Sequence, residues 1–208
     1  MFDFLEKLAA LRYLRFTDDY YLLGDDKLLF YFSNHLAEEY RTFITLFGLD
    51  YGAAQFLVGK KAGIQFVESH GKKLGKSFEE VIEVSEKVLH NLGWGRFATW
   101  KADQARSLLL INADLSTVAD DIKLQHGPQK YPADFLLSGL FAGAVEAFCA
   151  TKVYGIELDC RVQENVQTCQ FIAATEDEIT RYVKEFAPRS ASYAQDFIAR
   201  TKKLESKA

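Results

Sequence analysis

The sequence predicts an α+β fold in which helices pack on one face of an antiparallel sheet. Two observations lead to this prediction. Helical patterns fill much of the first half of the chain, and a strand–strand–helix–strand–strand segment follows between residues 96 and 173. The chain also has 208 residues, of which 49% are hydrophobic and 26% are charged, and this suits one globular domain that buries its own core.

The amino-terminal region predicts a helix followed by a hairpin. Residues 2–14 carry apolar side chains at helical spacing. Short apolar runs at 20–23 and 28–32 then flank residues 24–27, Gly-Asp-Asp-Lys, whose composition favours a tight turn between two strands.

Three helices are expected next. The first covers residues 35–47 and the second covers residues 50–70. The third begins after Ser77, because Ser77 and Glu80 have the spacing of a capping box. Glycines inside the second helix let another backbone approach closely, and there are three of them, Gly52, Gly59 and Gly63.

The rest of the chain supplies the predicted sheet. Strands are expected at 96–100 and 106–112, and a closing hairpin is expected at 156–161 and 168–173. The polar stretch 113–131 is expected to be a loop. Further helices are expected over three ranges, 135–153, 175–186 and 193–204.

Charge and composition exclude several classes of function. A net charge of −4 and a pI near 5.6 argue against binding to nucleic acid, whose partners carry a basic excess. No run of 18 uncharged apolar residues occurs, so no membrane span is expected. The first 14 residues do not read as a secretory leader, and the three cysteines have no secreted spacing, which together predict a cytoplasmic protein with reduced thiols.

A carboxylate and two cysteines near the closing hairpin have the spacing of metal ligands. Glu157 and Cys160 belong to its first strand, and Cys169 begins its second strand. Side chains alternate between faces along a strand, so a bulge or the strand end is needed to bring Glu157 and Cys160 together. The hairpin can return Cys169 to Cys160. These residues can supply three of the four ligands of a tetrahedral zinc ion, and the alternative is that both cysteines are buried and chemically idle.

This end of the chain resembles the closing motif of the 4-vinyl reductase domain family. The family pattern is Pro-x-Cys, a glycine-rich helix, Glu-x-x-Cys, a turn and Cys-x-Phe. The matching stretches are 131–143, Tyr-Pro-Ala-Asp-Phe-Leu-Leu-Ser-Gly-Leu-Phe-Ala-Gly, then 152–160, Lys-Val-Tyr-Gly-Ile-Glu-Leu-Asp-Cys, and 169–171, Cys-Gln-Phe. A looser resemblance extends over roughly residues 13–175. The predicted domain covers residues 1–175, and residues 176–208 form a carboxyl-terminal helical extension of the same domain.

The resemblance implies a fold shared with subunits of the TRAPP vesicle-tethering complex and with bacterial sensor domains for phenols and toluenes. It also implies a zinc site built from Glu157, Cys160 and Cys169. The fourth ligand of the family is a cysteine, and here that position holds Asp134, whose carboxylate is also able to bind zinc. The turn departs from the family pattern too, because Asn165 follows Glu164 where a glycine is expected.

Two further features bear on function. Four aromatic side chains are expected to line an apolar pocket for a small hydrophobic ligand, with simple core packing as the alternative: Trp94, Phe97, Phe135 and Phe141. The helix at 135–153 also carries a small-residue stripe, which serves either packing within the domain or a homodimer interface: Ser138, Gly139, Ala142 and Gly143.

The leading hypothesis is therefore a non-catalytic, sensor-like domain that binds a small hydrophobic ligand beside a structural zinc ion. No Ser/His/Asp order, phosphate-binding loop or dinucleotide fingerprint is present, so no catalytic residue is assigned. Two alternatives remain open. The chain takes part in 4-vinyl reduction of a tetrapyrrole, as a reductase-type oxidoreductase, or it is a dimeric scaffold like a TRAPP subunit.

Overall fold

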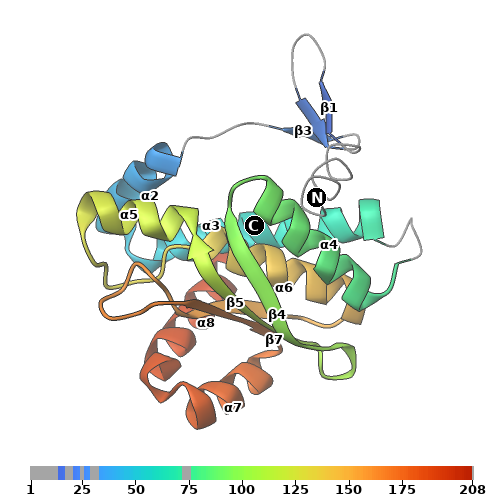
Figure 1. Ribbon diagram of the computed structural model, residues 1–208. Helices are drawn as coiled ribbons and strands as arrows, with labels where there is room; N and C mark the ends of the chain where they lie inside the picture. Colours follow the sequence, from blue (N-terminus) through green and yellow to red (C-terminus); the bar gives the residue numbers. More distant parts are fainter. Residues whose placement is uncertain (1–13, 17–20, 24–25, 29–32, 72–75, 208) are drawn as a thin grey trace.

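The computed structural model describes residues 14–16, 21–23, 26–28, 33–71 and 76–207 (Figure 1). Three short strands form a small antiparallel sheet in the order β1 (Leu14–Phe16), β2 (Tyr21–Leu23) and β3 (Asp26–Leu28). The predicted hairpin is confirmed by the pairing of β2 with β3, although β3 begins two residues before the predicted strand. The helix predicted at 2–14 lies outside the described residues except for Leu14, which belongs to β1.

The three helices expected in the first half of the chain are present. They are α2 (Ser33–Phe47), α3 (Leu49–Phe66) and α4 (Phe78–Asn91), and a π-helical turn, Val67–Gly71, extends α3 close to its predicted end. Ser77 begins α4 with the predicted capping box, in which the Ser77 hydroxyl accepts from the Glu80 amide and the Glu80 carboxylate accepts from the Ser77 amide.

The main sheet contains four antiparallel strands in the order β4-β5-β7-β6. The strands are β4 (Gly95–Asp103), β5 (Leu108–Ser116), β6 (Tyr154–Asp159) and β7 (Cys169–Ala174). A 3₁₀ turn, Gln104–Arg106, joins β4 to β5 near the predicted position.

Two predictions about this half of the chain are wrong. Residues 113–131 are not a loop, because they contain α5 (Thr117–His126), which Ser116 caps by accepting from the Ala119 amide. The helix predicted to end at residue 153 is α6 (Phe135–Cys149). It ends early because Ala150 adopts a left-handed conformation, with φ of 50°, and cannot continue an α-helix.

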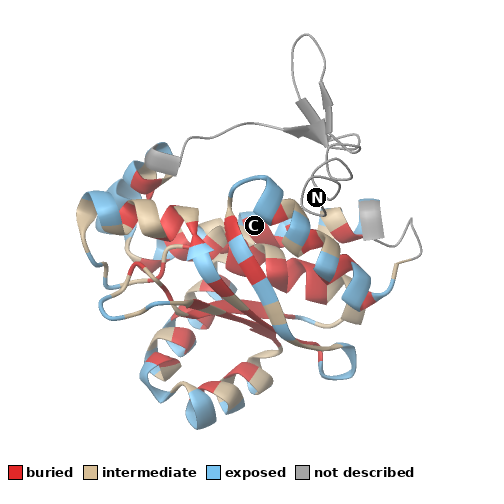
Figure 2. Cartoon of the chain, viewed as in Figure 1, coloured by how far each residue is buried: buried red, intermediate tan, exposed pale blue. Residues whose placement is uncertain are grey.

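The layers agree with the predicted fold class. The helix α6 packs on β6 and β7, and α3 packs along α6 on the side away from the sheet (Figure 1). Two final helices, α7 (Glu176–Phe186) and α8 (Ala191–Glu205), follow β7, and α8 contacts both α3 and α7. Figure 2 shows the buried residues gathered on the sheet and on the helix faces that meet it.

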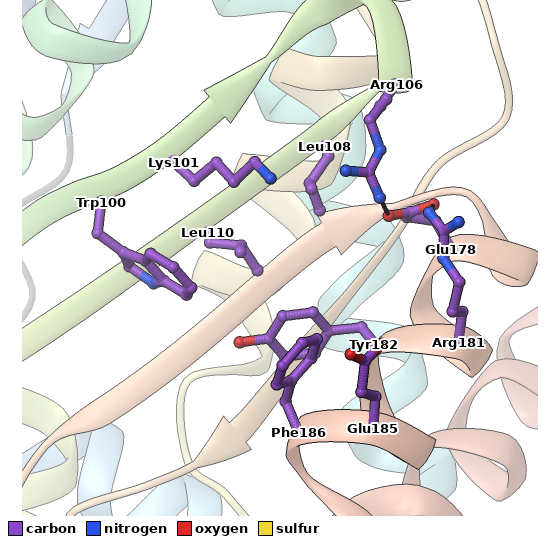
Figure 3. Close-up of a pocket in the computed structure, with 10 residues that line it drawn as sticks. All are labelled: Trp100, Lys101, Arg106, Leu108, Leu110, Glu178, Arg181, Tyr182, Glu185 and Phe186. Atoms are coloured by element: carbon purple, nitrogen blue, oxygen red, sulfur yellow. Dashed lines mark hydrogen bonds and ion pairs between the residues drawn. The ribbon is translucent and has the colours of Figure 1, made fainter.

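The α+β class is as predicted, but the helices are not confined to one face, because α7 lies on the opposite side of the sheet from α6 (Figure 1). Between α7 and the strands β4 and β5, a cavity of about 430 Å³ remains (Figure 3).

The close contact predicted from the glycines of α3 is confirmed. A Cβ atom added at Gly59 would lie 2.0 Å from the Leu136 carbonyl oxygen, and one added at Gly143 would lie 2.0 Å from the Lys60 carbonyl oxygen. These distances mean that the backbones of α3 and α6 touch directly. Since Gly139 and Gly143 face α3, the small-residue stripe packs within the chain and is not free to form a homodimer interface.

Candidate metal centre

A β-bulge in β6 brings the predicted carboxylate and cysteine onto one face of the sheet. Glu157 pairs with Phe171 and Asp159 pairs with Gln170, so Leu158 is an extra residue in β6. The extra residue reverses the alternation of side chains after Glu157. As a result, Cys160 follows on the face of Glu157, as the cluster requires, and Asp159 points to the other face.

The other two residues of the cluster come from β7 and from the start of α6. Cys169 is the first residue of β7 and lies beside the end of β6. Asp134 is the residue that precedes α6, and its backbone N–H donates to Glu157 Oε2 over 2.9 Å. The Asp134 carboxylate accepts from the Ser116 hydroxyl over 2.6 Å. Asp134 is thus fixed by β5 on one side and by β6 on the other.

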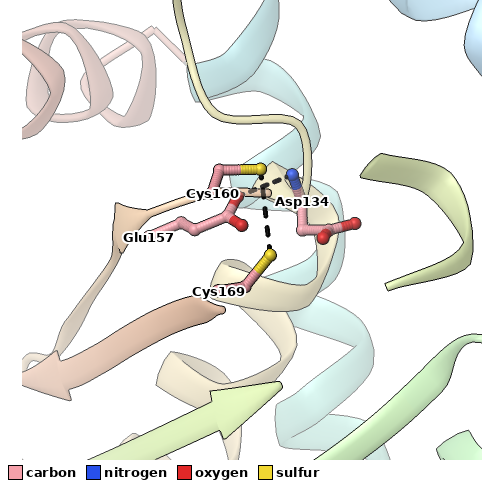
Figure 4. Close-up of side chains that lie close together, drawn as sticks. All are labelled: Asp134, Glu157, Cys160 and Cys169. Atoms are coloured by element: carbon pink, nitrogen blue, oxygen red, sulfur yellow. Dashed lines mark hydrogen bonds between the residues drawn. The ribbon is translucent and has the colours of Figure 1, made fainter. Parts of the chain in front are cut away.

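The four predicted ligands lie together (Figure 4). One ligand atom from each of Asp134, Glu157, Cys160 and Cys169 lies within 4.8 Å of all the others. The two sulfur atoms are 3.9 Å apart, which is far longer than a disulfide bond of about 2.05 Å. Two thiolates that share a tetrahedral zinc ion, with Zn–S bonds of about 2.3 Å, stand about 3.8 Å apart. The sulfur separation therefore fits a shared metal.

The cluster is closed to solvent. The exposed fractions are 3% for Asp134, 1% for Glu157 and 0% for both cysteines. Glu157 Oε1 is buried and has no hydrogen-bond partner among the described residues. A buried carboxylate oxygen without a partner is unfavourable by itself, so the arrangement fits a cation that completes it.

Burial makes the charged forms of these groups unfavourable in the metal-free protein. Burial raises the pKa of Asp134 to about 6, and the Ser116 hydroxyl opposes this shift. Burial, followed by the nearby Cys169 and Asp134, raises the pKa of Glu157 well above its usual range. Burial and the hydrogen bond with Cys169 likewise raise the pKa of the Cys160 thiol. A bound cation reverses these effects, because it favours carboxylate and thiolate.

The turn between β6 and β7 holds the two cysteines in place. The Cys160 amide donates to Gln163 Oε1 over 3.1 Å, and the Arg161 amide donates to the Cys169 sulfur over 3.3 Å. An N–H group that donates to sulfur stabilises a thiolate. Asn165 adopts a left-handed conformation with φ of 60°, the backbone geometry that the glycine expected at this turn would provide.

Sequence reasoning missed three polar groups around the cluster. Ser116 binds Asp134 directly. The phenols of Tyr40 and Tyr193 are both buried near the cluster, and burial together with the charges of Glu157 and Cys160 raises the pKa of each. Tyr40 lies on α2 and Tyr193 on α8, so no spacing within the sequence links them to the hairpin. For Ser116, its position as the capping residue of α5 was the one sequence signal that marked it as an ordered polar group.

The four aromatic residues predicted to line a pocket lie in separate parts of the core. Phe97 and Phe141 pack edge to face, with ring centroids 6.0 Å apart, and both contact Phe171. Phe135 is 2% exposed and packs against Tyr40 and Phe197 on the other side of α6. Trp94 is half-buried against the core.

Comparison with known proteins gives a likeness in fold. No family model and no curated protein matches the chain. Among solved structures, it is similar to the phenol-responsive sensory domain of the transcription activator PoxR, solved with phenol. The TM-score is 0.69 at 16% identity, over 86% of this chain and 94% of that chain.

A further solved structure is a trafficking protein particle complex subunit 3 from Naegleria fowleri, covalently bound to palmitic acid. It has a TM-score of 0.47 at 16% identity, over 68% of this chain and 93% of that chain. In the described part of the chain, no helix has both the length and the apolar character needed to cross a bilayer. On the TM-score of 0.69 alone, the protein shares the α+β fold of the PoxR sensory domain.

Proposed function

We propose that the chain is a non-catalytic, sensor-like domain that binds a small hydrophobic ligand and holds a zinc ion as a structural element. The convergence of Asp134, Glu157, Cys160 and Cys169 in one buried cluster carries the metal half of this proposal. The likeness in fold to a phenol-responsive sensory domain supports the ligand half.

The donor set favours zinc among the common metals. Magnesium and calcium prefer sites made only of oxygen ligands, whereas thiolates select softer metals. Two sulfur and two oxygen ligands complete a tetrahedral coordination shell, so no position remains open for a substrate. Zinc would join the start of α6 to β6 and β7 and would neutralise charges that burial otherwise makes unfavourable.

The metal half is tested by metal content. Purified protein is expected to contain about one zinc ion per chain by elemental analysis. Cys160→Ser is expected to lose the metal and to lower the melting temperature. Cys149→Ser is the matched control, because Cys149 is the third free cysteine and lies on α6 outside the cluster. The decisive sample is wild-type protein that is purified without chelator and refolded with zinc in excess. If this protein contains no zinc, the metal site is contradicted.

The ligand half requires a pocket that opens between packed rings. We propose that Phe97 and Phe141 separate to admit an aromatic ligand, since both rings lie between α6 and the sheet beside a third ring, Phe171. Phenol is the first probe, measured by titration calorimetry. Phe141→Leu is expected to weaken phenol binding by about tenfold, because it removes an edge-to-face ring contact. Absence of measurable heat with phenol and with larger apolar phenols would contradict this half.

Two outcomes would favour the alternative functions instead. A coloured tetrapyrrole that copurifies with the chain would favour a role in vinyl reduction. A stable dimer in light scattering, together with no ligand binding, would favour a scaffold like a TRAPP subunit.

A further inference from the structure

The cavity between α7 and the sheet is separate from the metal centre, because the two lie at different positions along the strands and on opposite faces of the sheet. Lys101 pairs with Leu110, and Leu110 pairs with Ile172, so these side chains share one face of the sheet. Cys169 pairs with Ala113, three residues further along β5 and on the other face. This cavity therefore belongs to neither the metal site nor the rings between α6 and the sheet.

A second β-bulge shapes the wall of this cavity. Thr99 pairs with Ile111 and Lys101 pairs with Leu110, so Trp100 is an extra residue in β4. Consecutive residues of a regular strand point to opposite faces, yet Trp100 and Lys101 both line the cavity. The Thr99 amide donates to Glu86 Oε1 over 2.5 Å, which satisfies a backbone group beside the bulge.

Aromatic side chains from two elements face each other across an apolar floor. Figure 3 shows Trp100 of β4 opposite Tyr182 and Phe186 of α7, with Leu110 between them. The Tyr182 and Phe186 rings are in contact, with centroids 5.1 Å apart. Trp100 is 55% exposed and Phe186 is 63% exposed, which is unusual for such large apolar groups.

The rim of the cavity has a surplus of positive charge. Glu178 accepts from both Arg106 and Arg181, so its charge is already matched by two guanidinium groups. Lys101 and Glu185 also line the cavity, which gives three cations against two carboxylates. The Lys101 ammonium has no hydrogen bond or ion pair with another described residue, so it is available to an incoming anion.

We propose that this aromatic slot, formed by Trp100, Lys101, Leu108, Leu110, Tyr182 and Phe186, binds a planar aromatic carboxylate. The ring of the ligand inserts between Trp100 and the two rings of α7, and its carboxylate pairs with Lys101. The volume of about 430 Å³ lies within the usual range of small-molecule sites, roughly 300–1,000 Å³. The slot is too small for a stable protein interface, which buries about 800 Å² on each partner.

The test compares a charged probe with its uncharged analogue. The probes are 2-naphthoate and 2-naphthol, and binding is measured by titration calorimetry and by quenching of tryptophan fluorescence in the full chain. Wild-type protein is expected to bind 2-naphthoate more tightly than 2-naphthol. Lys101→Gln is expected to weaken 2-naphthoate by roughly five- to tenfold and to leave 2-naphthol within about twofold. Trp100→Ala is expected to weaken both probes by about tenfold.

Two control variants keep the result specific. Lys184→Gln removes an exposed lysine of α7 that does not line the slot, and Leu124→Ala removes an apolar side chain that is 83% exposed on α5. Both are expected to bind the probes as wild-type does. Because Trp100 is largely exposed, Trp100→Ala is expected to keep the melting temperature of the wild-type protein.

Three results would overturn the proposal. The first is no saturable binding of 2-naphthoate up to about 1 mM. The second is binding that Trp100→Ala and Lys101→Gln do not change, which would place the probe elsewhere. The third is a concentration-dependent dimer that Trp100→Ala abolishes, which would make the slot a contact with a second copy of the chain. None of these results depends on zinc, so they test the aromatic slot independently of the proposed metal site.

Discussion

Asp134 connects the local structure of α6 with the electrostatics of the metal centre. Its backbone binds Glu157, its carboxylate binds Ser116, and burial raises its pKa to about 6. A group with these contacts cannot gain or lose a proton without affecting three elements of the fold. The protonation state of this one residue therefore reports on the stability of the metal-free protein.

Metal-free protein is expected to gain stability from Asp134 as the pH falls from about 7.5 to about 5. The carboxyl group has a pKa of about 6 when folded and about 3.9 when unfolded, so the folded state holds a proton that the unfolded state has released. This contribution is fully present below the unfolded pKa and is lost as the pH rises through about 6. The gain over this interval is about 1 kcal/mol.

The measurement is urea unfolding of chelator-treated protein at both pH values, for wild type and for Asp134→Asn. The difference between the two proteins isolates Asp134 from the surface carboxylates, which respond to acid in the opposite sense. A difference that does not change with pH would contradict the raised pKa. With zinc bound, stability is expected to rise with pH instead, because the metal competes with protons for its ligands.

At the scale of elements, the backbones of α3 and α6 touch directly at their glycines. Gly59→Ala is expected to lower the free energy of unfolding by about 3 kcal/mol, because the new methyl group would lie 2.0 Å from the Leu136 carbonyl oxygen. This loss exceeds the gain of about 1 kcal/mol that alanine brings to a helix interior. Urea unfolding measures it.

Gly52→Ala is the matched comparison on the same helix. The added methyl group would meet the Phe135 ring at 2.7 Å, and a side chain is able to shift where a backbone is not. A smaller loss of stability is expected. Equal losses at the two positions would contradict the assignment of the effect to backbone contact.

A buried lysine joins α3 to α6 and α8. Lys60 Nζ lies 2.9 Å from Glu146 and 3.4 Å from Glu205, and its side chain is 8% exposed. Lys60→Met is expected to destabilise the protein by about 2 kcal/mol, because it leaves the partly buried Glu146 without its cation, whereas Glu205 keeps its ion pair with Lys152. Lys61→Met, at the exposed neighbouring position, is expected to change stability by less than about 0.5 kcal/mol in the same unfolding experiment. A similar effect of both variants would contradict a specific role for Lys60.

Most elements were predictable because their signals are local. Capping residues and apolar spacing located α4 and α7 with their caps, and short apolar runs located the strands. The helix α5 was missed because it buries only Val118, Ala119 and Ile122 and otherwise reads as polar loop. The early end of α6 was missed because nothing in Ala150 itself favours the left-handed conformation; the chain must turn there to reach β6.

At the scale of the whole molecule, the metal centre joins segments that are far apart in the sequence. Removing zinc with a chelator is expected to lower the melting temperature by about 5–10 °C, which corresponds to about 2.7 kcal/mol at a free zinc concentration 100 times the Kd. Thermal unfolding followed by circular dichroism measures the change. Cys160→Ser is expected to show no response to chelator, and a response equal to wild type would contradict the site.

The candidate site was predictable only in part. Glu157, Cys160 and Cys169 follow from spacing within one hairpin, whereas Asp134 came from the family resemblance. The phenols of Tyr40 and Tyr193 and the hydroxyl of Ser116 reach the cluster from α2, α8 and the end of β5. Tertiary packing brings these groups together, and no pattern within a short stretch of sequence encodes that packing.

The bulges at Leu158 and Trp100 decide how this sheet responds to a change in strand length. Side chains alternate between the two faces along a regular strand. Leu158 and Trp100 are each one residue more than this alternation allows. Exchanging either residue for another keeps the extra position. Deleting it leaves a regular strand in which the residues that follow keep their partners and their faces. Loss of the single codon for Leu158 would therefore straighten β6, and Cys160 would stay on the face of Glu157, because it would then stand two residues after it.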